Sequence, residues 1–152
     1  MVLIAAGSET TSTLLAGATY LLLSNPDAMA KLKFEVRNAF DSADKITIAS
    51  ASRLPYMLAC LNETLRMYPP VTGGMVRDVA PGGTTIAGHV IPGGTMVECK
   101  PWAMNHSSLY WNDPWAFRPE RYLQEKTALA NAGALEAFQP FSTGPRNCIG
   151  KK

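Results

Sequence analysis

A cysteine near the end of the sequence lies in a segment suited to holding a metal-binding thiolate. Residues 141–150 read F-S-T-G-P-R-N-C-I-G, with Cys148 as the thiol. Gly144 permits a bend that side chains would block, and Gly150 lets the chain pass close to a flat ligand. Arg146 places a cation two residues before the sulfur, where it can pair with a carboxylate. Because a thiolate is a strong metal ligand, the segment indicates a metal site; a buried structural cysteine is the alternative.

A carboxylate and a guanidinium group lie three residues apart in a second segment. Glu63 and Arg66 share one face of a predicted helix, so they can form an ion pair. In isolation this would be an ordinary surface pair. Leu58, Leu61 and Leu65 surround it, however, and indicate that it is buried. Because buried charges are costly unless they are well paired, we expect a third partner.

The first part of the chain that must position these side chains is predicted to be helical. Residues 1–23 carry a single charge, Glu9, and are long enough to raise the question of a membrane span. Their centre is a run of Ser and Thr side chains, which are costly in hydrocarbon, so we predict a long helix buried inside the protein instead. Pro26 and Pro55 each open a further helix, the first amphipathic and the second covering residues 56–68.

The second half of the chain has a different pattern. Between residues 71 and 99, short β-rich runs are separated by glycine pairs, and we predict strands over residues 84–87, 89–91 and 95–99. Residues 101–122 read as short helical turns in irregular chain, and residues 123–137 as a mobile loop. The expected fold class is mainly α with small β-sheets.

Composition argues against several classes of function. The chain has 14 basic and 12 acidic residues, a net charge of +2, so it lacks the dense basic surface that binds nucleic acid. Cys60, Cys99 and Cys148 are odd in number and widely spaced, which indicates neither a disulfide framework nor a zinc cluster. His89 and His106 have no partner at a spacing that would make a metal site.

The spacing around Cys148 matches F-x-x-G-x-R-x-C-x-G at every fixed position, and it resembles the signature of the cytochrome P450 family. Glu63 and Arg66 are similar to that family's E-x-x-R element. The segment F-R-P-E-R-Y, residues 117–122, resembles its P-E-R-F stretch. The resemblance implies that Arg121 completes a structural triad, which locks the loop beneath the haem.

The same resemblance implies roles for other residues. A-G-S-E-T-T, residues 6–11, resembles the family's oxygen-activating stretch, in which Glu9 and Thr10 would relay protons; packing or back-bonding hydroxyls are the alternative. Arg77 corresponds to a basic residue that reaches a haem propionate in many members, the alternative being an exposed strand-edge arginine. Further residues implied around the haem are Phe141, Gly144, Arg146 and Gly150, and those implied in the substrate pocket are Ala6, Val71, Thr72 and Gly73.

The resemblance implies a monooxygenase that binds haem b through Cys148 and inserts one oxygen atom from O2 into an apolar organic substrate. Electrons would come from NADPH through a flavoprotein reductase. The segments G-H-x-I-P-G-G-T and N-H-S are similar to fungal microsomal members, which implies the cytosolic face of the endoplasmic reticulum. A membrane anchor would then lie outside the present chain.

The resemblance covers nearly all of residues 1–152 but only the carboxy-terminal part of the family's fold. We therefore expect one partial P450 domain that is truncated at both ends. A competing hypothesis is a non-enzymatic fragment that neither binds haem nor folds alone. A cysteine-nucleophile enzyme is the weaker third hypothesis, because no motif places a histidine beside Cys148.

Overall fold

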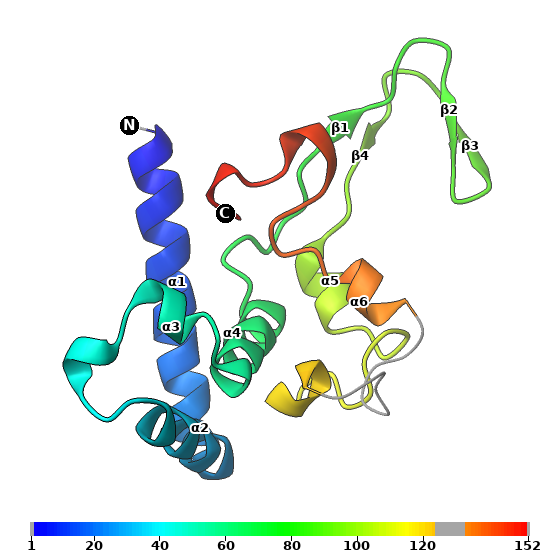
Figure 1. The fold of residues 1–152 in the computed structure, drawn as a ribbon. Coiled ribbons are helices and arrows are strands. Elements are labelled where there is room, and N and C mark those ends of the chain that lie inside the picture. Colours follow the sequence, from blue (N-terminus) through cyan, green and yellow to red (C-terminus); the bar gives the residue numbers. More distant parts are fainter. Residues whose placement is uncertain (1, 124–132, 152) are drawn as a thin grey trace.

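The computed structural model describes residues 2–123 and 133–151, and these form a mainly helical fold with two small antiparallel sheets (Figure 1). The α-helices are α1 (Val2–Ser24), α2 (Pro26–Ala39), α3 (Ile48–Ala51), α4 (Pro55–Met67), α5 (Pro101–Asn105) and α6 (Ala134–Ala137). Short 3-10 helices are η1 (Ala43–Lys45), η2 (Pro119–Tyr122), η3 (Gly144–Arg146) and η4 (Ile149–Lys151). The fold class predicted from the sequence is confirmed.

The long helix α1 is buried only over part of its length. Its buried residues, Gly17, Ala18 and Leu22, all lie in its C-terminal half. Leu3 is 74% exposed and Ile4 75% exposed. The prediction of a buried helix is therefore wrong for the N-terminal half, because α2 and α4, which pack on α1, meet it near its C-terminal end. Within the described part of the chain, no helix has the length and apolar character needed to cross a membrane.

The core that joins the first helices is small and apolar. Leu22 of α1, Ala28 of α2, and Tyr56 and Cys60 of α4 form one buried cluster. Partly buried Met29, Leu32 and Phe117 pack against it. This cluster orients α4, the helix that carries Glu63 and Arg66.

A side chain from α2 caps the start of α4. The residue before the helix, Leu54, has no side chain that can accept a hydrogen bond there. Instead, the backbone N–H groups of Tyr56 and Met57 donate to Glu35 Oε1 and Oε2 at 2.7 and 2.8 Å. A carboxylate at this position satisfies two free N–H groups and complements the positive end of the helix dipole.

The two sheets are short pairs of strands. Strand β2 (Thr84–Ile86) pairs with β3 (His89–Ile91), and β1 (Arg77–Asp78) pairs with β4 (Met96–Val97). The predicted strand 84–87 ends one residue early because Ala87 and Gly88, with φ angles of 49° and 83°, form the two-residue turn. The predicted strand 95–99 is likewise shortened to β4, and the sequence pattern does not predict β1.

A helix replaces part of the predicted mobile loop over residues 123–137. Helix α6 starts after Gly133, and Ala134 is only 1% exposed. Ala134 packs with Trp111, and Phe138 packs against the same pair. The loop prediction is wrong for this helix because its apolar side chains dock on a buried indole. The rest of the prediction, over residues 124–132, lies outside the described residues.

Candidate functional site

The carboxylate of Glu63 binds two arginines inside the protein. Arg66 donates from Nε to Oε2 at 2.8 Å and from Nη2 to Oε1 at 2.9 Å. Arg121 donates from Nε to Oε1 at 3.1 Å, and the backbone N–H of Arg118 donates to the same oxygen at 3.0 Å. The three triad side chains are at most 1% exposed. The structure thus brings together the three residues expected to form the triad, from α4 and η2.

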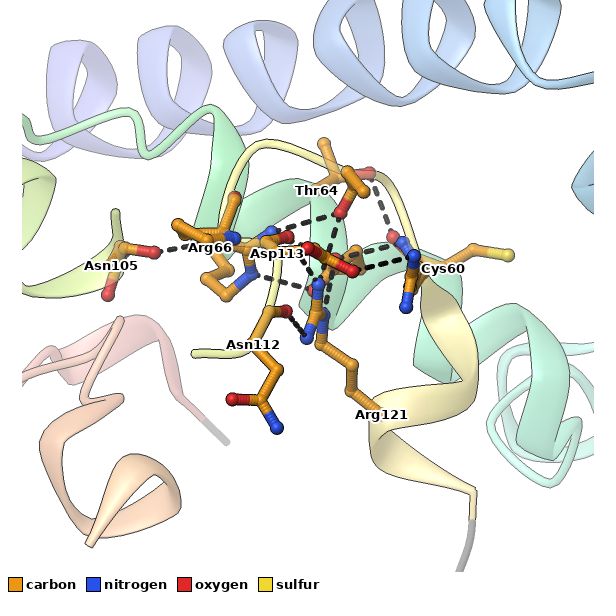
Figure 2. A network of polar contacts seen from close by, with 11 residues as sticks. Cys60, Thr64, Arg66, Asn105, Asn112, Asp113 and Arg121 are labelled. Carbon is orange, nitrogen blue, oxygen red and sulfur yellow. Dashed lines mark hydrogen bonds and ion pairs between the residues drawn. The ribbon is translucent and has the colours of Figure 1, made fainter. Parts of the chain in front are cut away.

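The two guanidinium groups carry one more positive charge than Glu63 balances, and backbone carbonyls surround this excess (Figure 2). The acceptors are the oxygens of Asn105 and Pro114 for Arg66, and of Asn112 and Asp113 for Arg121, at 2.6–2.7 Å. Oriented carbonyl dipoles lower the free-energy cost of burying a cation. The triad consequently holds the irregular chain between α5 and η2 around itself.

Aromatic side chains separate the triad from the cysteine segment. The Trp111 ring lies 5.2 Å from the guanidinium carbon of Arg66, a cation–π contact, and packs edge-on against Phe138. The indole N–H of Trp111 and the hydroxyl of Tyr122 are buried without a hydrogen-bond partner among the described residues. A shallow pocket of about 240 Å³ lies between this cluster and the cysteine segment; its lining includes Asn62, Tyr122, Phe138, Phe141 and Lys151.

Cys148 lies on an exposed loop that is closed by its own backbone. The Cys148 N–H donates to the carbonyl of Phe141 at 2.8 Å, and the Asn147 N–H donates to that of Gly144 at 3.1 Å. Gly144 has a φ angle of 77°, so the chain bends where glycine is expected. A side chain at Gly150 would begin 3.7 Å from the sulfur, and glycine keeps that space open. Because the thiol is exposed, the alternative of a buried structural cysteine does not hold in this structure.

The two expected proton-relay residues lie next to each other on α1. Glu9 is exposed, and the Thr10 hydroxyl donates to the carbonyl of Ala6 at 2.6 Å. Within residues 2–123 and 133–151, no hydrogen bond joins the Glu9 carboxylate to this hydroxyl. The structure thus shows the back-bonded alternative for Thr10, and the relay stays a prediction.

The remaining expected residues lie on exposed chain. Val71 and Thr72 follow α4, and the carbonyl of Thr72 accepts a hydrogen bond from the Trp102 N–H at 3.4 Å. Arg77, on β1, donates to the neighbouring carbonyl of Val76 at 2.9 Å, as a strand-edge arginine does. Ala6, Gly73 and Arg146 are also exposed. Their roles around a haem or a substrate also stay predictions.

Comparison with known proteins identifies the family. A family model described as "Cytochrome P450" matches residues 1–152. The chain belongs to the cytochrome P450 family. It is 51% identical over 149 residues to cytochrome P450 monooxygenase 1 of Neocamarosporium betae, covering 98% of this chain and 30% of that protein. It is 49% identical over 150 residues to the trichothecene C-15 hydroxylase of Fusarium sporotrichioides, with the same coverages.

A solved structure of a zebra fish cytochrome P450 with progesterone resembles this chain with a TM-score of 0.79 and 31% identity. The similarity covers 96% of this chain and 32% of that structure. The chain therefore spans about 30% of the length of the curated relatives described here.

The cysteine loop of this P450 chain suits an iron whose other ligands come from a porphyrin. Among the described residues, no group of three or more His, Cys, Asp or Glu side chains could hold a metal ion. In a haem site of the family's kind, Cys148 would supply one ligand and the macrocycle would supply others. The exposed Arg146, two residues before the sulfur, is available to a carboxylate. The residues present fit a haem.

Sequence reasoning missed a second polar cluster, which also holds η2. Lys31 Nζ lies 2.6 Å from Glu120 Oε1, and the Tyr56 hydroxyl donates to the same oxygen at 3.1 Å. Burial alone would raise the pKa of Glu120, but the hydrogen bonds from Lys31 and Tyr56 hold it below its ordinary value. No local spacing signals this cluster, because the partners are 89 and 64 residues away.

Proposed function

We propose that this chain is the haem-binding part of a monooxygenase that inserts one oxygen atom from O2 into an apolar organic substrate. The observation that supports this most is the exposed Cys148 thiol on a glycine-bent loop, in a chain that belongs to the P450 family. Relatives named as monooxygenases and as a hydroxylase agree with this reaction class. Because the chain spans about 30% of the length of those relatives, the proposal concerns the extended protein, meaning a protein of the relatives' length that contains this chain.

In this proposal Cys148 would hold the haem iron through its thiolate. Bound haem supplies the activation of O2, which a thiolate ligand promotes by donating electron density. Arg146 and Arg77 would pair with the haem propionates, and Gly144 and Gly150 would leave room beside the flat ring. The triad of Glu63, Arg66 and Arg121 holds the chain around η2 rigid, so that the cysteine loop packs on a fixed base.

The residues of α1 would have two roles, proton supply and substrate contact. The Thr10 hydroxyl would exchange its hydrogen bond with Ala6 for one to water, and Glu9 would supply protons to that water. Ala6, Val71 and Thr72 would line the substrate pocket. Electrons reach the protein from NADPH through a flavoprotein reductase at the cytosolic face of the endoplasmic reticulum, by resemblance to fungal members.

The test is a reduced carbon-monoxide difference spectrum of the extended protein expressed with haem. A Soret shift typical of thiolate ligation is expected, and it should vanish in Cys148→Ser. The matched control is Cys99→Ser, which changes another exposed cysteine and should leave the spectrum unchanged. Failure of both this chain and the extended protein to take up haem would end the proposal.

The competing function is a non-enzymatic fragment, and the exposed N-terminal half of α1 favours testing it. The chain alone and the extended protein are to be compared for haem uptake and cooperative unfolding. In-frame coding sequence before Met1 and after Lys152 would support the extended protein. Its absence, with no haem uptake by the chain, would support the fragment.

A further inference from the structure

One contact between α1 and the end of α4 requires a glycine. Gly17 is buried on α1, and a Cβ added there would lie 2.7 Å from Cδ1 of the Tyr68 ring and 3.4 Å from Cγ2 of Thr64. Two carbon atoms do not approach to 2.7 Å without repulsion, so a side chain at position 17 would force its neighbours to move. Gly17 therefore sets how closely the Tyr68 ring packs on α1.

Of the two residues next to Gly17, Tyr68 is the one whose side chain can move. Thr64 is fully buried, its hydroxyl donates to the Cys60 carbonyl at 2.8 Å, and it follows Glu63 of the triad directly. Tyr68 is 51% exposed and lies just beyond the helix. Its backbone is still tied to α4, because its N–H donates to the Thr64 carbonyl at 2.7 Å. A displaced Tyr68 ring would thus pull on the point where the chain leaves α4.

The chain that leaves α4 at Tyr68 leads to residues that are proposed to line the substrate pocket. Val71 lies three residues beyond Tyr68, at most about 10 Å of extended chain. Ala6, the α1 residue proposed to line the pocket, lies eleven residues before Gly17, about 16 Å along the helix. The Gly17–Tyr68 contact is therefore connected through the chain to both sides of the proposed pocket: to Ala6 through α1, and by a shorter path to Val71 and Thr72 after α4.

We infer that the Gly17–Tyr68 contact sets the distance between the two walls of the substrate pocket, Ala6 on α1 and Val71–Thr72 after α4. Gly17 and Tyr68 would then be positioning residues that determine the size of substrate the pocket accepts. This inference rests on the proposed function, since it concerns the same pocket. Neither residue touches the reacting atoms. Both act through the path of the chain that carries Val71 and Thr72.

The experiment compares two haem-binding probes in the extended protein: imidazole, which is small, and 4-phenylimidazole, which carries an additional phenyl ring. The Kd of each probe is measured by spectral titration. The ratio of the two Kd values reflects the space beside the haem, and it does not depend on how much of the protein contains haem because both probes are measured on the same sample. Gly17→Ala should change this ratio about fivefold or more, a shift of about 1 kcal/mol. Thr19→Ala, on the exposed face of the same helix, should leave it unchanged.

Tyr68→Leu added to Gly17→Ala should return the ratio to within about twofold of the wild type, because the shorter side chain makes room for the new methyl group. A Gly17→Ala protein with a lower Tm but an unchanged ratio would overturn the inference, since the contact would then be merely structural. If Gly17→Ala does not fold, Tyr68→Ala must change the ratio instead, and an unchanged ratio has the same meaning. Failure of the wild type to bind imidazole would count against the proposed function itself.

Discussion

The Nε of Arg66 lies 2.8 Å from Oε2 of Glu63, and neither side chain is exposed to solvent. The ion pair between Lys45 and Asp41 is just as short, at 2.7 Å, but its side chains are 57% and 87% exposed. Water and salt screen the second pair and not the first. Burial rather than distance therefore determines how much each pair matters to folding.

Arg66→Ala should lower the free energy of unfolding of the extended protein by about 3–5 kcal/mol, because it removes one partner of a buried pair. Arg66→Lys should recover only part of this loss, since an ammonium group cannot donate to both Glu63 oxygens and two carbonyls at once. Urea denaturation followed by circular dichroism measures both changes.

Lys45→Ala is the matched control for the surface pair and should cost less than about 1 kcal/mol. A loss of that small size for Arg66→Ala as well would mean that the triad is accessible to water in the extended protein. The two variants thus separate burial from the presence of an ion pair.

The sequence could predict features that depend on local spacing. The i,i+3 relation of Glu63 and Arg66, the proline that opens α4 and the turn at Gly88 all follow from residues close together in the chain. The capping box of Thr47 and Ser50 at the start of α3 is also local, and a reading of the polar stretch before Pro55 could have found it.

Contacts between distant segments could not be predicted in this way. Glu35 caps α4 from another helix, and nothing around it distinguishes it from the exposed charges of α2. The apolar composition of α1 likewise predicts burial without saying which elements cover it. Leu3 and Ile4 remain exposed because the described elements pack only on the other end of the helix.

Glu35→Ala should destabilise the extended protein by about 1–2 kcal/mol, since two N–H groups at the start of α4 lose their acceptor. Glu35→Gln retains one oxygen without the charge and should lie between the wild type and Glu35→Ala. Urea denaturation is again the measurement. The control is Glu98→Ala, which removes a carboxylate paired with the exposed Lys100; an equal effect of the two alanine variants would contradict the cap.

His106 should make stability depend on pH. Its ring packs at a tilt against both Trp102 and Trp115, with ring centroids 4.0 and 4.4 Å away. Burial lowers the pKa of His106 below its ordinary value of 6.5, and the nearby Arg66 cation acts in the same direction. The folded state thus favours the neutral ring. Its stabilisation is complete above pH 6.5 and declines as the pH falls from there through the lower folded pKa.

The direction of this pH dependence can be tested by measuring the unfolding free energies of the wild type and of His106→Gln between about pH 7.5 and about pH 5, a range that brackets the ordinary histidine pKa. The wild type should lose more stability on acidification than the variant does. His89→Gln, at an exposed strand position, should behave as the wild type. A steeper acid loss in His106→Gln would mean that the folded state prefers the charged ring.

The cysteines should differ sharply in reactivity. Cys60 is 2% exposed, and burial, reinforced by nearby carboxylates, raises its pKa to about 12, whereas Cys99 and Cys148 are exposed. Iodoacetamide reacts with thiolates, so in the haem-free extended protein it should modify Cys99 and Cys148 but reach Cys60 only after denaturation. Peptide mapping by mass spectrometry distinguishes the three sites. In the haem-loaded protein Cys148 should become protected from iodoacetamide, while Cys99 still reacts. Equal labelling of the two cysteines would mean that Cys148 does not bind the iron.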